Sequence, residues 1–403
     1  MGQAVNGSTV DSIKSAAEGL RKRHAETLAQ LPQETVVAAL AALGRRWRDP
    51  TYPLRREAET WQEPYPFEMV QVSLDALLDS LTPEKLRELF AAEGVSEALG
   101  YPVIGHVIAG NTPLLAWVSI IRALLVRSTS LVKLPSNASD RWAELFHRSL
   151  QEVAPEIAAC ICLMQWPGGT AQLDAGLCAD ADLVMAHGSD ATLRDLRAIC
   201  PSGTPFVGYG HRVSFGVLLL EADIKEAARG FAKDVLLYDQ GGCLSPQTIF
   251  VVGGGNNVEA FSSVLAEALS AVSQEYPLPV RSPRAAGAVA EARALAWMED
   301  ETTLWEDPAR RWTVIARPGS GLVASPTFGV VSVQPLASLD DLPEALGRVA
   351  NRLQGCAAAG TLTPGSYLPG VSYLCRPGQL QAPPLAWRQD GRDVLRVLLP
   401  PGS

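Results

Sequence analysis

Between residues 101 and 209 short apolar runs alternate with longer amphipathic runs, and this alternation limits the fold more than any other feature. The short runs predict strands and the longer ones predict helices. Strands are expected at residues 103–108, 130–134, 161–166, 182–186 and 205–209. Helices are expected at residues 114–125, 140–153, 171–178 and 190–199. This order is typical of a parallel α/β sheet with helices on both faces, which binds ligands beyond the carboxyl ends of its strands.

The segments on either side of this alternation have patterns of their own. Before it, helices are predicted at 10–31, 34–49 and 83–93, with an irregular connection at 59–68. After it, strands are predicted at 214–220, 248–252, 312–316 and 329–333, and helices at 223–237, 258–273, 287–298 and 339–353. A chain of 403 residues exceeds one ordinary core. We therefore expect a helical region (1–100), two α/β domains (101–210 and 211–360) and a tail (361–403).

Charge and composition exclude several classes of protein. The net charge is −9 and basic side chains form no stripe, which argues against a general nucleic-acid binder. The longest apolar run, 114–126, is interrupted by Ser119 and Arg122 and is too short to span a bilayer. Residues 1–10 lack the apolar core of a signal peptide, and the seven cysteines show no paired spacing. We expect a cytoplasmic protein with reduced thiols. The five scattered histidines argue against a metal site.

The segment from Tyr238 to Gln247 carries the strongest indication of chemistry. It follows the helix predicted at 223–237 and contains two glycines, one cysteine and one proline before the next strand. Gly241 and Gly242 are expected to allow backbone angles that a side chain forbids and to let a ligand approach closely. Cys243 on such a loop suits a nucleophile that accepts an acyl group. The alternative is a buried cysteine that acts only as a small apolar side chain.

Two further candidates lie where predicted strands end. Asn111, in Gly110-Asn111-Thr112-Pro113, could hold a developing oxyanion, or could simply cap the following helix. Lys133 could contact a nucleotide ribose or phosphate, or could be an ordinary surface charge. Ser136 is not acidic, so it would not repel the 2′-phosphate of a nucleotide.

Two glycine-containing turns precede predicted helices. Pro167-Gly168-Gly169 and Gly188-Ser189-Asp190 both offer backbone amides to a pyrophosphate. Neither is a G-x-G-x-x-G fingerprint, and capped helix starts with glycine are common.

Taken together, these segments resemble the aldehyde dehydrogenase superfamily and, within it, the LuxC-type acyl-CoA reductases. The resemblance covers about residues 101–332. It rests on Asp239-Gln240-Gly241-Gly242-Cys243-Leu244-Ser245-Pro246-Gln247, on Gly110-Asn111-Thr112-Pro113 and on residues 206–215. It implies an aldehyde dehydrogenase-like fold with a Rossmann-type NADP-binding domain (101–210) and a catalytic cysteine domain (211–360), the helical N-terminal region forming part of a cofactor or cover domain.

The same resemblance implies roles for single residues. Cys243 would be the nucleophile, and Asn111 with the Cys243 backbone amide would form the oxyanion hole. The cofactor would lie against a group of residues on the first domain: Lys133 and Ser136 near the adenosine ribose, and Pro167, Gly168, Gly188 and Ser189 near the pyrophosphate.

The chain departs from the superfamily pattern at two acids. Hydrolytic members carry a glutamate about 35 residues before the cysteine, where this chain has Gly208. Hydrolysis of an acyl-cysteine should then be slow, whereas exchange with a thiol needs no such base. His211 is a substitute for the missing base or a structural histidine. Near the nicotinamide ribose only Phe328 remains of an acid-x-phenylalanine pattern.

These observations predict NADPH-dependent reduction of an acyl thioester, carried on coenzyme A or a carrier protein, to an aldehyde through an acyl-cysteine. The choice of NADPH follows from Ser136 and from the resemblance. Two alternatives stay open: a CoA-acylating aldehyde dehydrogenase that runs oxidatively, and a non-catalytic docking subunit with a vestigial site. Superfamily relatives usually form dimers or tetramers, which leaves a homo-oligomer open.

Overall fold

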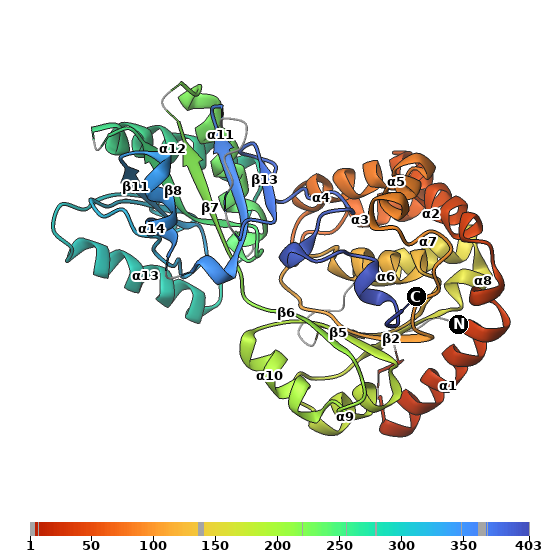
Figure 1. The fold of residues 1–403 in the computed structure, drawn as a ribbon. Coiled ribbons are helices and arrows are strands. Elements are labelled where there is room, and N and C mark those ends of the chain that lie inside the picture. Colours follow the sequence, from red (N-terminus) through yellow and green to blue (C-terminus); the bar gives the residue numbers. More distant parts are fainter. Residues whose placement is uncertain are drawn as a thin grey trace.

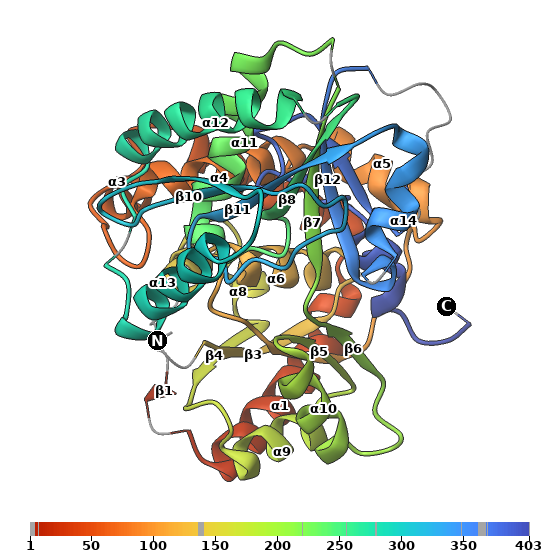
Figure 2. The same ribbon diagram turned by 90° about the vertical axis from the view of Figure 1, so that its left-hand side faces the viewer.

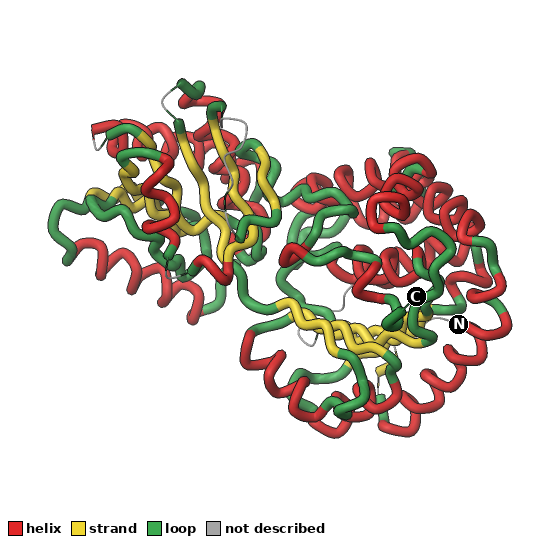
Figure 3. Tube along the Cα trace, viewed as in Figure 1, coloured by secondary structure: helices red, strands yellow, loops and turns green. Residues whose placement is uncertain are grey.

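The computed structural model describes residues 5–6, 8–135, 141–219, 221–254, 256–278, 280–347, 349–361, 368 and 370–402. Two α/β domains lie side by side, each with a sheet flanked by helices (Figures 1 and 3). None of the described helices combines the length and apolar character that a bilayer-spanning segment requires.

The first domain is built on a six-stranded sheet in which every pair is parallel. Its order is β1-β4-β3-β2-β5-β6. The strands are β1 (Val5–Asn6), β2 (Val103–Val107), β3 (Thr129–Leu134), β4 (Ile161–Gln165), β5 (Leu183–His187) and β6 (Phe206–Tyr209). The five strands predicted from the alternation are confirmed, and β1 adds a sixth from the N-terminus.

Helices cover both faces of this sheet, because alternate residues of each strand point to opposite sides. On one face α1 (Val10–Glu26), α9 (Ala171–Asp180) and α10 (Asp190–Ile199) pack on Val103, Leu131 and Val184. On the other face α6 (Leu115–Leu125) and α7 (Arg141–Val153) pack on Ile104 and Val132. The short helix α8 (Pro155–Ala158) joins α7 to β4.

The N-terminal helices extend the layer formed by α6 and α7. They are α2 (Gln33–Arg48), α3 (Pro53–Glu59), α4 (Phe67–Ser80) and α5 (Pro83–Glu93). Edge-on ring contacts connect these helices to α6 and α7: Trp117 of α6 contacts both Trp47 of α2 and Trp142 of α7. All three rings belong to one hydrophobic core. The predicted irregular connection at 59–68 is wrong from Phe67 onward, where α4 begins and buries Phe67, Val70 and Leu74.

The second domain is built on a seven-stranded sheet of order β13-β12-β7-β8-β11-β10-β9, with only the β9–β10 pair antiparallel. The strands are β7 (Val213–Leu218), β8 (Pro246–Val252), β9 (Thr303–Glu306), β10 (Thr313–Ala316), β11 (Val330–Leu336), β12 (Leu353–Ala359) and β13 (Tyr373–Cys375). Helices α11 (Ile224–Leu236) and α12 (Asn256–Glu275) cover one face, and α13 (Pro283–Trp297) and α14 (Leu342–Leu346) the other (Figure 2).

One prediction for this domain is wrong. Residues 339–353 were expected to form one helix, but they contain only α14 and short 3-10 turns before β12 begins at Leu353. Strand β12 ends in three alanines, Ala357–Ala359, and alanine favours a helix locally. It lies beside β7 with every side chain buried, so packing within the sheet overrides that preference.

A C-terminal tail, residues 376–399, runs back from the second domain over the first (Figure 1). Buried charged side chains from both domains hold its backbone. Arg122 of α6 donates to the carbonyl oxygens of Leu385 (2.9 Å) and Trp387 (3.1 Å). Asp234 of α11 accepts from two tail amides, and Glu93 of α5 accepts from three. The tail therefore ties the two domains together.

Candidate active site

Cys243 lies on the loop between α11 and β8, directly after a strained turn. Tyr238, Asp239 and Gln240 all have left-handed backbone angles, with φ of 57°, 51° and 61°. For residues with a side chain this conformation costs roughly 1–2 kcal/mol each. Gly241 has φ of −79°, and Gly242 is not among the residues with positive φ. The expectation that the two glycines supply the unusual angles is therefore wrong, because the three residues before them do so.

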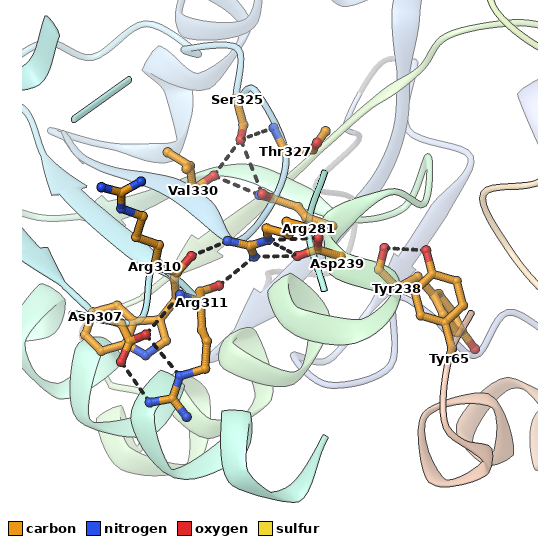
Figure 4. A network of polar contacts seen from close by, with 12 residues as sticks. Tyr65, Tyr238, Asp239, Arg281, Asp307, Arg310, Arg311, Ser325, Thr327 and Val330 are labelled. Atoms are coloured by element: carbon orange, nitrogen blue, oxygen red, sulfur yellow. Dashed lines mark hydrogen bonds and ion pairs between the residues drawn. The ribbon is translucent and has the colours of Figure 1, made fainter. Parts of the chain in front are cut away.

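Contacts from three directions hold this turn in place (Figure 4). The Tyr238 carbonyl accepts a hydrogen bond from the Tyr65 hydroxyl at 3.2 Å. Asp239 forms a bidentate ion pair with Arg281, with Nε 3.0 Å from Oδ2. The Gln240 amide donates to the carbonyl oxygens of Pro246 and Val330, each at 2.9 Å. Strain at a functional site persists only where surrounding contacts over-determine it, as they do here.

Gly242 lies directly against a side chain of the tail. A Cβ at this position would lie 2.8 Å from Oε1 of Gln381 in the tail. Gln381 is itself buried and donates to the Ser245 hydroxyl at 3.0 Å. The tail therefore packs directly against the Cys243 loop.

Half-buried Cys243 lines an apolar cavity of about 130 Å³ between the domains. Leu114, Leu115 and Val118 line it from the start of α6. The tail adds Pro383, Pro384 and Trp387. Burial, with a smaller contribution from the charge of Asp390, raises the pKa of the Cys243 thiol to about 11, although Arg212 and Gln354 oppose the shift.

Asn111 reaches the Cys243 loop from the other domain. Its Nδ2 donates to the carbonyl oxygen of Gly241 at 2.8 Å. Helix α6 begins at Leu115, and its N-cap residue Leu114 makes no side-chain cap. The alternative in which Asn111 caps this helix is therefore wrong. An amide carries two N–H groups, so one remains for a substrate oxygen.

The predicted cofactor residues gather at the carboxyl edge of the first sheet. Lys133 is buried near the end of β3, and burial lowers its pKa while the charge of Asp174 opposes this. Ser189 caps α10 by accepting from the Thr192 amide at 3.1 Å, and Gly188 directly precedes it. Pro167 and Gly168 form an exposed turn after β4. Ser136 lies outside the described residues.

The donors at this edge fit a dinucleotide. The first amides of a helix have no acceptor within the helix, so the start of α10 leaves N–H groups for phosphate oxygens. The Lys133 ammonium adds a positive charge near the end of β3, which is separated from β5 by β2. On the second domain, Phe328 donates its amide to the Asp239 carbonyl at 3.1 Å and lies under the Arg281 guanidinium.

His211 occupies a different environment from Cys243. Its side chain is exposed, and its backbone amide donates to Asp190 at 3.0 Å. It does not line the Cys243 cavity.

The family model for acyl-CoA reductase (LuxC) matches residues 28–399. This chain belongs to the LuxC family of acyl-CoA reductases. The match reaches beyond the segment that carries the sequence resemblance and takes in the N-terminal helices and the tail.

Named relatives of this LuxC family chain are long-chain acyl-protein thioester reductases. The Vibrio harveyi protein is 28% identical over 265 residues, which are 60% of this chain and 55% of that protein. The Photorhabdus laumondii protein is 26% identical over 270 residues, which are 62% and 56% of the two chains. The matched segment thus spans about half the length of these relatives.

Solved structures confirm the aldehyde dehydrogenase-like fold. An aldehyde dehydrogenase of Mycobacterium tuberculosis, complexed with NAD+, superposes with a TM-score of 0.73 at 16% identity, covering 99% of this chain and 92% of that one. The Δ-pyrroline-5-carboxylate dehydrogenase of the same organism gives 0.71 at 13% identity, covering 97% and 81%.

Sequence reasoning missed three side chains around Cys243 in this LuxC family member. Gln354 of β12 is fully buried, and its side chain opposes the rise in the pKa of the Cys243 thiol. Arg212, in the link between β6 and β7, pairs with Asp390 of the tail. Arg212 lies within a segment that carries the resemblance and could have been singled out. Asp390 could not, because the tail has no periodic pattern.

Proposed function

We propose that this chain reduces an acyl thioester, carried on coenzyme A or on a carrier protein, to the aldehyde with NADPH, through an acyl group held on Cys243. The observation that carries the proposal is the hydrogen bond from Asn111 to the Gly241 carbonyl. It brings a side-chain amide of the first domain to the nucleophile loop of the second, beside an apolar cavity that also contacts Cys243.

In the first half of the reaction the Cys243 sulfur attacks the thioester carbonyl. A carbon–sulfur bond forms and an electron pair moves onto the carbonyl oxygen. The free N–H of Asn111 and the Cys243 backbone amide stabilise this oxyanion. On collapse, the bond to the carrier sulfur breaks, the carrier leaves as a thiol with the equivalent of the proton that Cys243 has given up, and the acyl group stays on Cys243.

In the second half the acyl group is reduced and released. NADPH, when bound, supplies the hydride for this reduction. The start of α10 and Lys133 would hold its phosphates and ribose, and the non-acidic Ser136 favours NADPH over NADH. Asn111 again stabilises the negative oxygen of the reduced group. When the carbon–sulfur bond breaks, the aldehyde leaves and the Cys243 thiolate takes up a proton from solvent.

The surroundings of Gly208 favour reduction over hydrolysis. Gly208 lies on β6, where a Cβ would be 3.1 Å from the Phe206 ring and 3.2 Å from Leu193. The position at which hydrolytic relatives carry a glutamate is thus closely packed here. With no base there to activate water, the acyl-cysteine persists until it is reduced.

Trapping the acyl-enzyme tests this proposal. The chain is incubated with decanoyl-CoA without NADPH, and its peptides are analysed by mass spectrometry. We expect the acyl mass on the peptide that contains Cys243, and its loss in Cys243→Ala. Cys375→Ala, which removes another half-buried cysteine of the same domain, should keep the acyl group. An acyl group on another residue, or none under conditions where decanoyl-CoA binds, would refute the proposal.

A further inference from the structure

The tail places one carboxylate at the nucleophile loop. The Asp390 side chain is 5% exposed and forms a bidentate ion pair with Arg212, with Nε 2.9 Å from Oδ1. Asp390 also has a left-handed backbone, with φ of 56°. Asp tolerates this conformation better than most residues. The tail therefore turns sharply at the point where it delivers the carboxylate.

Both members of this pair are tied to the Cys243 loop. Ser214, two residues after Arg212, donates its hydroxyl to the Cys243 carbonyl at 2.8 Å. Gln389, the residue before Asp390, lines the same cavity as Cys243. The two charges act on the sulfur with opposite signs, because Asp390 raises the pKa of Cys243 and Arg212 lowers it.

Other charged and titratable groups also face this region. Arg122 and Tyr238 line the cavity. Burial lowers the pKa of Arg122 only to about 10, so it stays a cation, and burial raises the pKa of Tyr238, so its phenol stays neutral. Arg392 lies over the Tyr209 ring at 5.7 Å, close in sequence to Asp390.

We propose that the Arg212–Asp390 ion pair tunes the balance between thiol and thiolate at Cys243. Asp390 adds to the effect of burial in keeping the sulfur a neutral thiol, and Arg212 limits this addition and fixes the carboxylate in place. Both are positioning residues that act through Cys243. The inference rests on the proposed function in one respect: the role given to the ion pair is to restrain Cys243 until a thioester is bound.

The test is the pH profile of iodoacetamide alkylation at Cys243, followed on its peptide by mass spectrometry in the full chain. Asp390→Asn should move the alkylation midpoint to lower pH, and Arg212→Gln should move it to higher pH, each by about one unit or more. Both variants break the same ion pair. A merely structural role would therefore shift the two profiles in the same direction.

Two controls make the result specific. Arg311→Gln breaks another bidentate pair, with Asp307, and should leave the Cys243 profile unchanged. Asp390→Glu keeps the charge and should restore the native profile. If Asp390→Asn does not fold, the sign of the shift in Arg212→Gln decides alone. Equal shifts in both single variants, or no shift in a folded Arg212→Gln, would overturn the inference. Alkylation needs neither thioester nor NADPH, so this failure is distinct from failure of the reductase proposal.

Discussion

At the scale of single residues, the proposed chemistry depends on Asn111 and Cys243, which come from different domains. The hydrogen bond from Asn111 to Gly241 is the contact that joins them. The proposed chemistry needs an amide N–H at position 111 as a hydrogen-bond donor to the oxyanion. A carboxylate or a methyl group at this position has no N–H to donate.

Removal of this donor gives the first prediction. Asn111→Ala should lower the rate of acyl transfer to Cys243 by about 100- to 1000-fold, the usual effect of losing one oxyanion donor. Asn111→Asp should be at least as slow, since it adds a negative charge where one develops. The rate is read from release of free coenzyme A, with NADPH affinity as the control. An unchanged rate in both variants would show that Asn111 holds the loop without touching the reacting oxygen.

Asp234 links stability to pH. Its carboxylate is fully buried and accepts from the amides of Gly378 (2.7 Å) and Leu380 (3.0 Å), and burial raises its pKa to about 7. The folded protein binds this proton more tightly than the unfolded chain does. The stability contributed by Asp234 is therefore complete below about pH 4 and is lost as the pH rises through about 7.

The second prediction compares the native chain with Asp234→Asn, which cannot titrate. The difference in free energy of unfolding, native minus variant, should decrease by about 2 kcal/mol between pH 5 and pH 7. Urea unfolding at the two pH values measures it. An increase over the same interval would mean that the ionised carboxylate is the form that the two tail amides stabilise.

At the scale of elements, helix α11 carries the surface on which the tail rests. Gly230 lies inside this helix, and a Cβ there would meet the backbone of Pro377 at 2.6 Å. Gly287 lies inside α13, where a Cβ would meet nothing within 4 Å. Both glycines lie inside a helix, but a Cβ would meet the tail backbone at Gly230 and open space at Gly287.

The third prediction uses this contrast. Gly230→Ala should lower the free energy of unfolding by about 1–3 kcal/mol, because backbone atoms of the tail must move. Gly287→Ala should raise it by about 0.5–1 kcal/mol, because alanine favours a helix. Urea unfolding of the two variants measures both effects. Destabilisation of equal size in the two would show that the tail does not pack on α11 as described.

Helix α6 supplies one wall of the cavity beside Cys243. The fourth prediction is that Val118→Phe fills part of the 130 Å³ cavity and raises KM for decanoyl-CoA by about tenfold or more, roughly the effect of displacing two buried methylenes. KM for acetyl-CoA, which has no long acyl chain to fill the cavity, should change much less. Equal effects on the two substrates would mean that the acyl chain lies elsewhere.

Most elements of the two sheets could be predicted from the sequence, since buried parallel strands and amphipathic helices leave clear periodic patterns. Strand β12 could not, because Gly355 and the three alanines at its end carry no strand preference until β7 and β13 lie beside them. The turn at Tyr238–Gln240 was equally hidden. Its angles are imposed by Tyr65, Arg281 and Val330, which lie far away in the sequence.

At the scale of the whole molecule, the site exists only where the two domains and the tail meet. Residues at the strand ends could be expected to share one edge, since carboxyl ends of parallel strands do so. The contribution of the tail could not be foreseen, because its position depends on buried charges such as Arg122 and Asp234 rather than on its own pattern. Asp390 and the apolar residues of the cavity wall were missed for this reason.

The most direct test of the central claim is single-turnover oxidation of NADPH with decanoyl-CoA, followed by near-ultraviolet absorbance. The native chain should oxidise about one equivalent of NADPH and release decanal. Cys243→Ala should bind NADPH and oxidise none, because no acyl group can be held for reduction. Oxidation of NADPH by Cys243→Ala at the native rate, or none by the native chain on thioesters of coenzyme A and carrier protein alike, would contradict the account.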